Sequence, residues 1–203
     1  MAGGRKDIVS WAHSKVHGLE SFASLIRFLL EKRLIVLLGI AAFVLLFFFW
    51  SYFKVIAVMV LFIALAAVSM FYNRLIKVSV GVEMVMLGLV VTSVAFGRLP
   101  GLFVGLVGLL LAEVLSERFT YSTLVSFIGI AVVALIAPNI YHQTGSITSA
   151  GIILTVVYDA VIIPGYLLLG SNIGRSALFV VTHIIFNIWV FSFIAPVLLR
   201  VLA

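Results

Sequence analysis

The sequence predicts an all-α fold, a polytopic bundle of about seven transmembrane helices behind an N-terminal amphipathic helix. Of its 203 residues, 65% are hydrophobic and only 10% are charged, whereas soluble domains contain about 45–50% apolar and about 25% charged residues. Apolar runs long enough to cross a bilayer follow one another almost without interruption. Hydrocarbon, rather than water, is therefore expected to surround most of the chain.

The positive charge of the chain is distributed as in a membrane protein and not as in a nucleic-acid-binding protein. The formal net charge is +6, but the basic residues stand singly or in pairs at the ends of apolar runs and form no continuous basic face. We therefore expect the lipid bilayer as a partner, and no nucleic acid. The absence of cysteine excludes disulfides, thiolate metal sites and a cysteine nucleophile.

Residues 1–33 are predicted to form an amphipathic helix on the membrane surface, and residues 34–203 the transmembrane domain. Apolar residues recur in the first segment at three- and four-residue steps. Basic side chains such as Lys15 and Arg27 can meet the anionic headgroups of the inner leaflet, which favours a cytoplasmic N-terminus in the cell membrane. A helix packed on the protein's own loops is the alternative.

Seven apolar runs are predicted to span the membrane, and a six-helix core is the alternative. They cover residues 34–53, 55–72, 78–96, 101–115, 123–138, 150–170 and 177–199. Only Lys54 separates the first two runs, so they form either a tight hairpin or one long, tilted and kinked helix. The longest polar connection, residues 139–149, is expected to be an outward-facing loop.

The distribution of basic residues sets the predicted orientation. With a cytoplasmic N-terminus, ten lysines and arginines lie inside and three lie outside, as the positive-inside rule requires. The three outer residues are Lys54, Arg98 and Arg200. The C-terminus is then expected outside.

Small residues and prolines predict local features of the spans. A ridge of small residues, typical of close helix packing, consists of Gly97, Gly101, Gly105 and Gly108. Pro164, which precedes Gly165, and Pro196 predict bends or local unwinding in the last two spans.

A few polar groups lie inside the predicted spans, and they are the candidate site residues because charge in hydrocarbon is costly. They are Glu83, Glu113, Asp159, His183 and Asn187. Asp159 and Asn187 are both expected near mid-membrane, at about 1.5 Å of rise per residue. His183 and Asn187 are four residues apart and project from one helix face. We predict a buried ligand pocket or proton path lined by Asp159, His183 and Asn187.

The same residues admit other interpretations. Glu83 and Glu113 could pair with Lys77 and Arg118 near the interface, while the polar residues of the last two spans only cross-link helices. Aromatic side chains could line a pocket for a flat ligand or simply pack; they are Tyr158, Tyr166, Trp189 and Phe193. A metal site is a third interpretation, because histidine and carboxylates are suitable ligands, but the spacing from Asp159 to His183 matches no compact metal motif and none is predicted. No catalytic residue is predicted, and the sequence does not identify a cofactor.

Two segments carry a family resemblance. The glycine-rich stretch 81–137, with its core FGRLPGLFVGLVGLLLAEVLSERFTYSTLVSFIGIAVVALIAP, and the closing THIIFNIWVFSFIAPVLLRVL resemble the substrate-binding S components of energy-coupling-factor (ECF) transporters. They are also similar to the cell-shape protein type MreD. The resemblance implies a compact six-helix core that captures a micronutrient and associates with a transmembrane coupling subunit and ATPases. The chain itself has no G-x-x-x-x-G-K-[ST] phosphate loop.

Three functions follow as hypotheses. The first is a non-enzymatic integral membrane protein that binds or transports a small solute. The second is a membrane scaffold or anchor that recruits partners, or copies of itself, through the N-terminal helix. The third is an intramembrane enzyme, which would need converging catalytic groups such as paired aspartates; Asp159 is the only aspartate in any predicted span.

Overall fold

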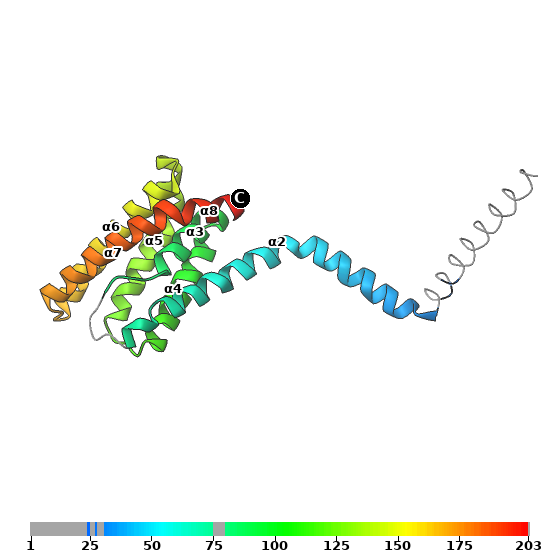
Figure 1. Ribbon diagram of the computed structural model, residues 1–203, viewed down its shortest axis with the longest axis horizontal. Helices are drawn as coiled ribbons and strands as arrows, with labels where there is room; N and C mark the ends of the chain where they lie inside the picture. Colours follow the sequence, from blue (N-terminus) through cyan, green and yellow to red (C-terminus); the bar gives the residue numbers. More distant parts are fainter. Residues whose placement is uncertain (1–23, 25–26, 28–30, 75–79, 203) are drawn as a thin grey trace, which may run out of the picture. The chain divides into compact units, whose positions relative to one another are not determined.

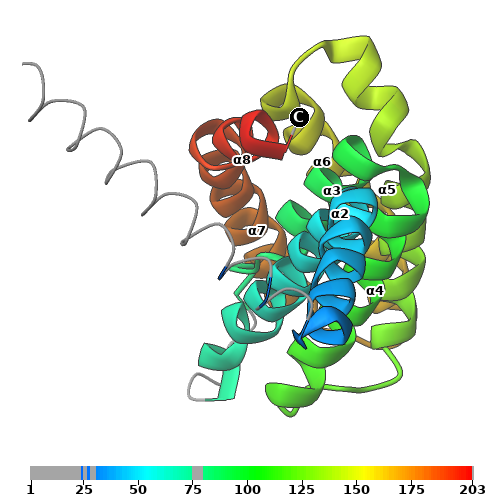
Figure 2. The ribbon, with the colours of Figure 1, turned by 90° about the vertical axis from the view of Figure 1, so that its right-hand side faces the viewer.

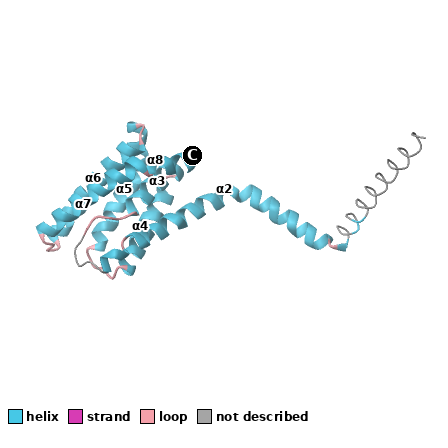
Figure 3. Cartoon of the chain, viewed as in Figure 1, coloured by secondary structure: helices cyan, strands magenta, loops and turns pink. Residues whose placement is uncertain are grey.

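The computed structural model describes residues 24, 27, 31–74 and 80–202, and all regular secondary structure in these ranges is helical (Figure 3). The helices are α2 (Arg33–Ser69), the 3-10 helix η1 (Phe71–Arg74), α3 (Val85–Phe96), α4 (Arg98–Leu115), α5 (Thr123–Thr144), α6 (Ile147–Leu168), α7 (Ile173–Phe193) and α8 (Ala195–Leu202) (Figure 1). Six helical segments within the described ranges are long and apolar enough to cross a membrane. The predicted all-α polytopic fold is confirmed. Most of the predicted surface helix, residues 1–33, lies outside the described residues.

The chain divides into two units, Met1–Phe53 and Lys54–Ala203. The described part of the first unit is the N-terminal half of α2, and no residue of its apolar segment Arg33–Trp50 is buried. Its exposed residues include a run of large aromatic side chains, Phe47, Phe48, Phe49 and Trp50. Such a surface is stable only in an apolar environment, as a membrane span requires.

Helix α2 is continuous through Lys54, so the predicted tight hairpin is wrong and the alternative of one long helix is correct. The physical reason is the absence of a helix-breaking residue. The sequence contains neither glycine nor proline between Gly39 and Gly81, and a single lysine is a good helix former.

Helix α3 is the central helix of the second unit. Nine of its 12 residues are buried, and it packs against α4, α5, α6, α7 and α8. Figure 2 shows α3 among the other labelled helices of this unit. The predicted span 78–96 is therefore corrected: the helix begins only at Val85, and residues 80–84 are not helical. This non-helical stretch, which we call the entry segment, carries Glu83.

The connection between α5 and α6 is shorter than predicted. Helix α5 continues through Pro138 to Thr144, and α6 begins at Ile147, so the predicted loop 139–149 is mostly helical. Gly145 ends α5 because its φ of 64° lies in the left-handed region. The Ser146 side chain then accepts a hydrogen bond from the Ser149 backbone N–H and caps α6.

The two prolines of the last spans behave differently from each other. Helix α6 continues through Pro164, so of the bend or local unwinding predicted there the unwinding is wrong; one proline removes only one backbone donor from a helix held by its neighbours. Near Pro196 the prediction is confirmed, because α7 ends at Phe193 and α8 begins at Ala195.

The glycine ridge of α4 is a packing seam, as predicted. A Cβ atom at Gly105 would lie 2.7 Å from Cγ2 of Ile130 on α5, and one at Gly108 would lie 3.0 Å from Cβ of Ala66 on α2. Both positions therefore allow a close helix approach that a side chain would prevent. Gly97 does not belong to the seam; with a φ of 104° it forms the turn between α3 and α4.

Candidate functional site

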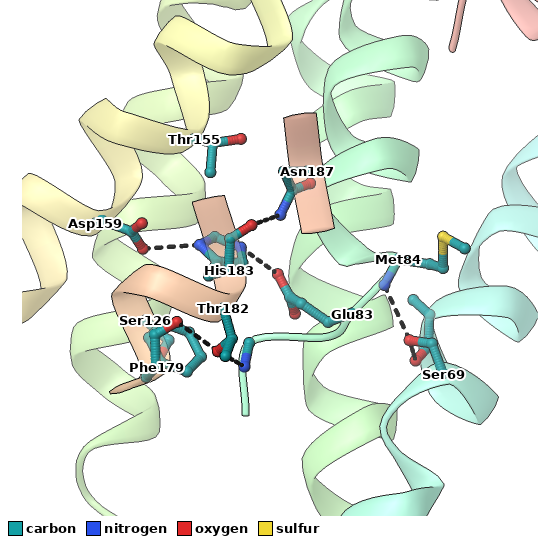
Figure 4. A network of polar contacts seen from close by, with 12 residues as sticks. Ser69, Glu83, Met84, Ser126, Thr155, Asp159, Phe179, Thr182, His183 and Asn187 are labelled. Carbon is teal, nitrogen blue, oxygen red and sulfur yellow. Dashed lines mark hydrogen bonds and ion pairs between the residues drawn. The ribbon is translucent and has the colours of Figure 1, made fainter. Parts of the chain in front are cut away.

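Three ionisable side chains meet in the interior of the second unit, and we call them the ionisable cluster: Glu83, Asp159 and His183 (Figure 4). Nδ1 of His183 lies 2.8 Å from Oδ1 of Asp159, and Nε2 lies 3.3 Å from Oε1 of Glu83. His183 is fully buried, and the two carboxylate residues are only 4–5% exposed. The entry segment, α6 and α7 each supply one member.

The arrangement fixes the chemistry that the cluster can perform. A neutral imidazole donates from one ring nitrogen only, whereas an imidazolium donates from both. An imidazolium at His183 can therefore donate to both carboxylates at once. With both carboxylates ionised, the cluster then carries one net negative charge in a protein interior, where a charge is tolerated only with partners. The cluster can consequently accept or release a proton inside the bundle.

The entry segment is held in place by side chains instead of by helical hydrogen bonds. The Gly81 N–H donates to Oγ1 of Thr182 (2.8 Å), and the Met84 N–H donates to Oγ of Ser69 (3.0 Å); Figure 4 shows the bond between Met84 and Ser69. The Tyr72 hydroxyl donates to the Val80 carbonyl oxygen (2.6 Å). These bonds satisfy backbone groups that have no helical partner and so fix the position of Glu83.

Gly81 is the residue that lets the entry segment reach α7. A Cβ atom at this position would lie 2.6 Å from the backbone Cα and N atoms of His183. Any residue with a side chain would push the two backbones apart. The close approach therefore depends on a glycine here, and the Glu83–His183 contact depends on the close approach.

Asn187 and two aromatic rings complete the surroundings of His183. The Asn187 side-chain amide donates to the His183 carbonyl oxygen one turn away (3.0 Å). The Phe179 ring stacks on the imidazole at 5.2 Å between centroids, and the Tyr158 ring lies at 5.6 Å. Oδ2 of Asp159 and Oδ1 of Asn187 are buried acceptors with no hydrogen-bond partner among the described residues.

A polar cavity of about 530 Å³ lies at one end of the second unit. It is formed where helices begin or end, and its lining includes Asn73, Glu113, Arg118, Tyr166, Arg175 and Ser176. The Glu113 carboxylate also accepts a hydrogen bond from the Thr123 hydroxyl. Phe179 lines the cavity as well, so one aromatic ring borders both the cavity and the imidazole of the ionisable cluster.

The structure places the six predicted site residues in two groups. Asp159, His183, Asn187, Tyr158 and Glu83 lie together in the interior, whereas Glu113 lies on the cavity. Asp159 and Asn187 are expected from the sequence at a similar depth in the membrane. In the structure both lie next to His183, which links α6 to α7.

The structure describes only part of the alternative in which Glu83 and Glu113 pair with Lys77 and Arg118. Lys77 lies outside the described residues, so its pairing with Glu83 stays a prediction, while Glu83 itself is buried and contacts His183. No group of three or more histidine, aspartate or glutamate side chains in ranges 31–74 and 80–202 is arranged to hold a metal ion. Trp189 and Phe193 are exposed, at 51% and 66%, and thus line no interior pocket.

Sequence reasoning did not single out several cavity residues. Arg175 was interpreted only as a marker of topology, Arg118 as such a marker and as a pairing partner of Glu113, and Asn73 and Ser176 were not considered. These four residues share only their position, since each lies within a few residues of a helix end. Polar residues are ordinary at such places, so the sequence offers no reason to select them.

Comparison with family models, curated proteins and solved structures returned no match to this chain. The resemblance to ECF S components and to MreD therefore remains a prediction from the two sequence segments.

Proposed function

We propose that this integral membrane protein binds a small polar solute in the cavity of the second unit and carries it across the membrane. The observation that supports the proposal is that Phe179 lines this cavity and also stacks on His183 of the buried ionisable cluster. Ionisable groups inside a membrane bundle are rare and mark substrate or proton pathways. The proposal is for a non-enzymatic protein, since only binding and proton exchange are required of these residues.

The contact between cavity and cluster suggests how the two could be coupled. The Phe179 ring covers His183 on one side and borders the cavity on the other. A solute that displaces this ring would change the surroundings of His183, and a change of charge on His183 would act back on the ring. Such reciprocity is the thermodynamic requirement for coupled binding of two ligands, here a solute and a proton.

The charge pattern supports a cytoplasmic opening of the cavity. Arg118 and Arg175 line it, and arginine is enriched on the cytoplasmic side of membrane spans. The opposite end of the unit carries Arg98, which donates to Oδ1 of Asn139 at 2.9 Å. We accordingly propose that the cavity exchanges solute with the cytoplasm in this conformation.

A pair of serine-to-tryptophan variants tests where the solute binds. Ser171 lines the cavity, so Ser171→Trp should fill the space and abolish binding. Ser149 is an exposed residue that does not line this cavity, so Ser149→Trp should bind as the wild type does. The measurement is the melting temperature of the detergent-solubilised full-length protein against vitamins, amino acids, metals and lipids, because a ligand specific for the folded state raises it.

The transport step is tested with proteoliposomes. A solute that stabilises the wild type should accumulate when a pH gradient is imposed, and accumulation should fail for Ser171→Trp. Binding without accumulation would contradict autonomous transport and favour solute capture for a separate coupling subunit. No stabilising solute in the whole panel would contradict the proposal.

The scaffold function is a second candidate, and the exposed surface of α2 favours it. No residue of Arg33–Trp50 is buried, which leaves this span available to another membrane helix or to a second copy of the chain. Deletion of residues 1–30 separates the candidates. A scaffold would lose its partner, as measured by co-purification, whereas a solute-binding protein would keep its ligand-induced rise in melting temperature.

A further inference from the structure

We infer that the solute is a small zwitterion that carries both a primary ammonium group and an anionic carboxylate or phosphate. This inference rests on the proposed function, because it names the class of molecule that the cavity would hold. Two sets of cavity residues of opposite character support it. One set favours an anionic group, and the other favours a hydrogen-bond donor with a positive charge.

The anionic group is favoured at the start of α7. Arg175 lines the cavity with its exposed guanidinium-bearing side chain, and it lies in the first turn of a 21-residue helix. The N-terminal end of a helix carries partial positive charge, which attracts anions. The Asn172 side chain already accepts hydrogen bonds from the Gly174 and Arg175 backbone N–H groups, so the guanidinium is the direct donor in this site.

The ammonium group is favoured by the second set, Asn73 and Glu113. Asn73 lines the cavity and is only 5% exposed, and its Oδ1 atom is buried without a hydrogen-bond partner among the described residues. A buried acceptor without a donor costs free energy that a ligand can recover. Glu113 lines the same cavity and adds a carboxylate. Both groups accept hydrogen bonds, so a cationic donor satisfies them best.

The balance of charge favours a zwitterion over the simpler ligands. The cavity contains a glutamate and two arginines, Arg118 and Arg175, and Arg118 also donates to the Asn73 carbonyl oxygen at 3.4 Å. A plain anion would leave the Asn73 acceptor unsatisfied, and a plain cation would leave Arg175 without a counter-charge. A volume of about 530 Å³ is within the range of small-ligand pockets, so an amino acid fits with space for its side chain.

The test compares whole zwitterions with their two halves. Isothermal titration calorimetry on the full-length protein in a non-ionic detergent uses neutral α-amino acids, each with its deaminated carboxylate and its decarboxylated amine. Phosphoethanolamine represents the phosphate form, and phosphatidylethanolamine added to the micelle represents a lipid headgroup. We expect an amino acid or phosphoethanolamine to bind at least about tenfold more tightly than either half, since each charged group is held by its own partner.

Two charge-neutralising variants assign the two halves of the zwitterion to the two sets of cavity residues. Arg175→Gln should weaken binding of the zwitterion and of the carboxylate half by about tenfold and leave the amine half unchanged. Glu113→Gln should do the reverse, and its amide oxygen can still accept the Thr123 hydrogen bond. Arg200→Gln and Glu117→Gln are the matched controls, because both residues lie outside this cavity and should leave every affinity unchanged.

The possible outcomes separate this inference from the proposed function. Stabilisation by phosphatidylethanolamine alone would support the inference with a lipid headgroup as the source of the zwitterion. Halves that bind as tightly as the whole molecule would overturn it. Binding of a solute without both charges, lost in Ser171→Trp, would overturn the zwitterion and retain the proposed function. The absence of any ligand would overturn both.

Discussion

Replacing His183 with alanine should lower the free energy of unfolding by about 3–5 kcal/mol, the cost of removing one partner from a buried ion pair. The imidazole is fully buried and faces a carboxylate oxygen at each ring nitrogen. Without it, Glu83 and Asp159 share the interior with no compensating positive charge, and an empty space remains beneath Phe179. Both the unpaired carboxylate charge and the lost packing therefore contribute to the loss of stability.

Reversible unfolding in sodium dodecyl sulfate, followed by circular dichroism, measures this loss. His142→Ala is the matched control, because His142 is exposed in the last turn of α5 and its removal should cost less than about 0.5 kcal/mol. A triple variant that adds Glu83→Gln and Asp159→Asn to His183→Ala should recover about half of the lost stability, since no uncompensated charge is left. A triple variant no more stable than His183→Ala would mean that packing alone explains the effect.

The part of this structure that the sequence predicts best is the part set by local composition. The apolar runs predict the bounds of α4 to α7 to within a few residues, except at the C-terminal ends of α5 and α7. They do so because about 20 apolar residues define a span. The meeting of Asp159 with His183 was also foreseeable. Both lie about ten residues from the same end of neighbouring antiparallel helices, α6 and α7, and a constant rise per residue gives them equal depth.

The position of Glu83 could not be predicted, because it depends on a departure from helical structure. The apolar stretch around Gly81 fits a helix by composition, so the span was expected to begin before it. The entry segment instead stays non-helical, held by the side chains of Thr182, Ser69 and Tyr72. These partners are far away in the sequence or lie in another helix, and no local pattern identifies them.

Replacing Gly81 with alanine should have the second large effect, a loss of about 1–3 kcal/mol typical of overpacking in a closely packed interior. The new Cβ atom would lie 2.6 Å from the Cα and N atoms of His183. Because these are backbone atoms, no side-chain rotation relieves the clash, and the entry segment must move away from α7. Glu83 would then be withdrawn from Nε2 of His183, and the solute-dependent rise in melting temperature should fall with it.

Two further variants show whether the steric clash is the cause. Gly39→Ala adds the same methyl group where nothing lies within 4 Å, and it should be neutral or stabilising by up to about 1 kcal/mol, since alanine favours a helix. Thr182→Val removes the acceptor of the Gly81 N–H without adding bulk, and it should cost about 1 kcal/mol. If Thr182→Val destabilises the protein as much as Gly81→Ala does, the hydrogen bond and not the close approach holds the entry segment. A larger loss for Gly81→Ala, in contrast, would identify the backbone contact as the feature that brings the second carboxylate to His183.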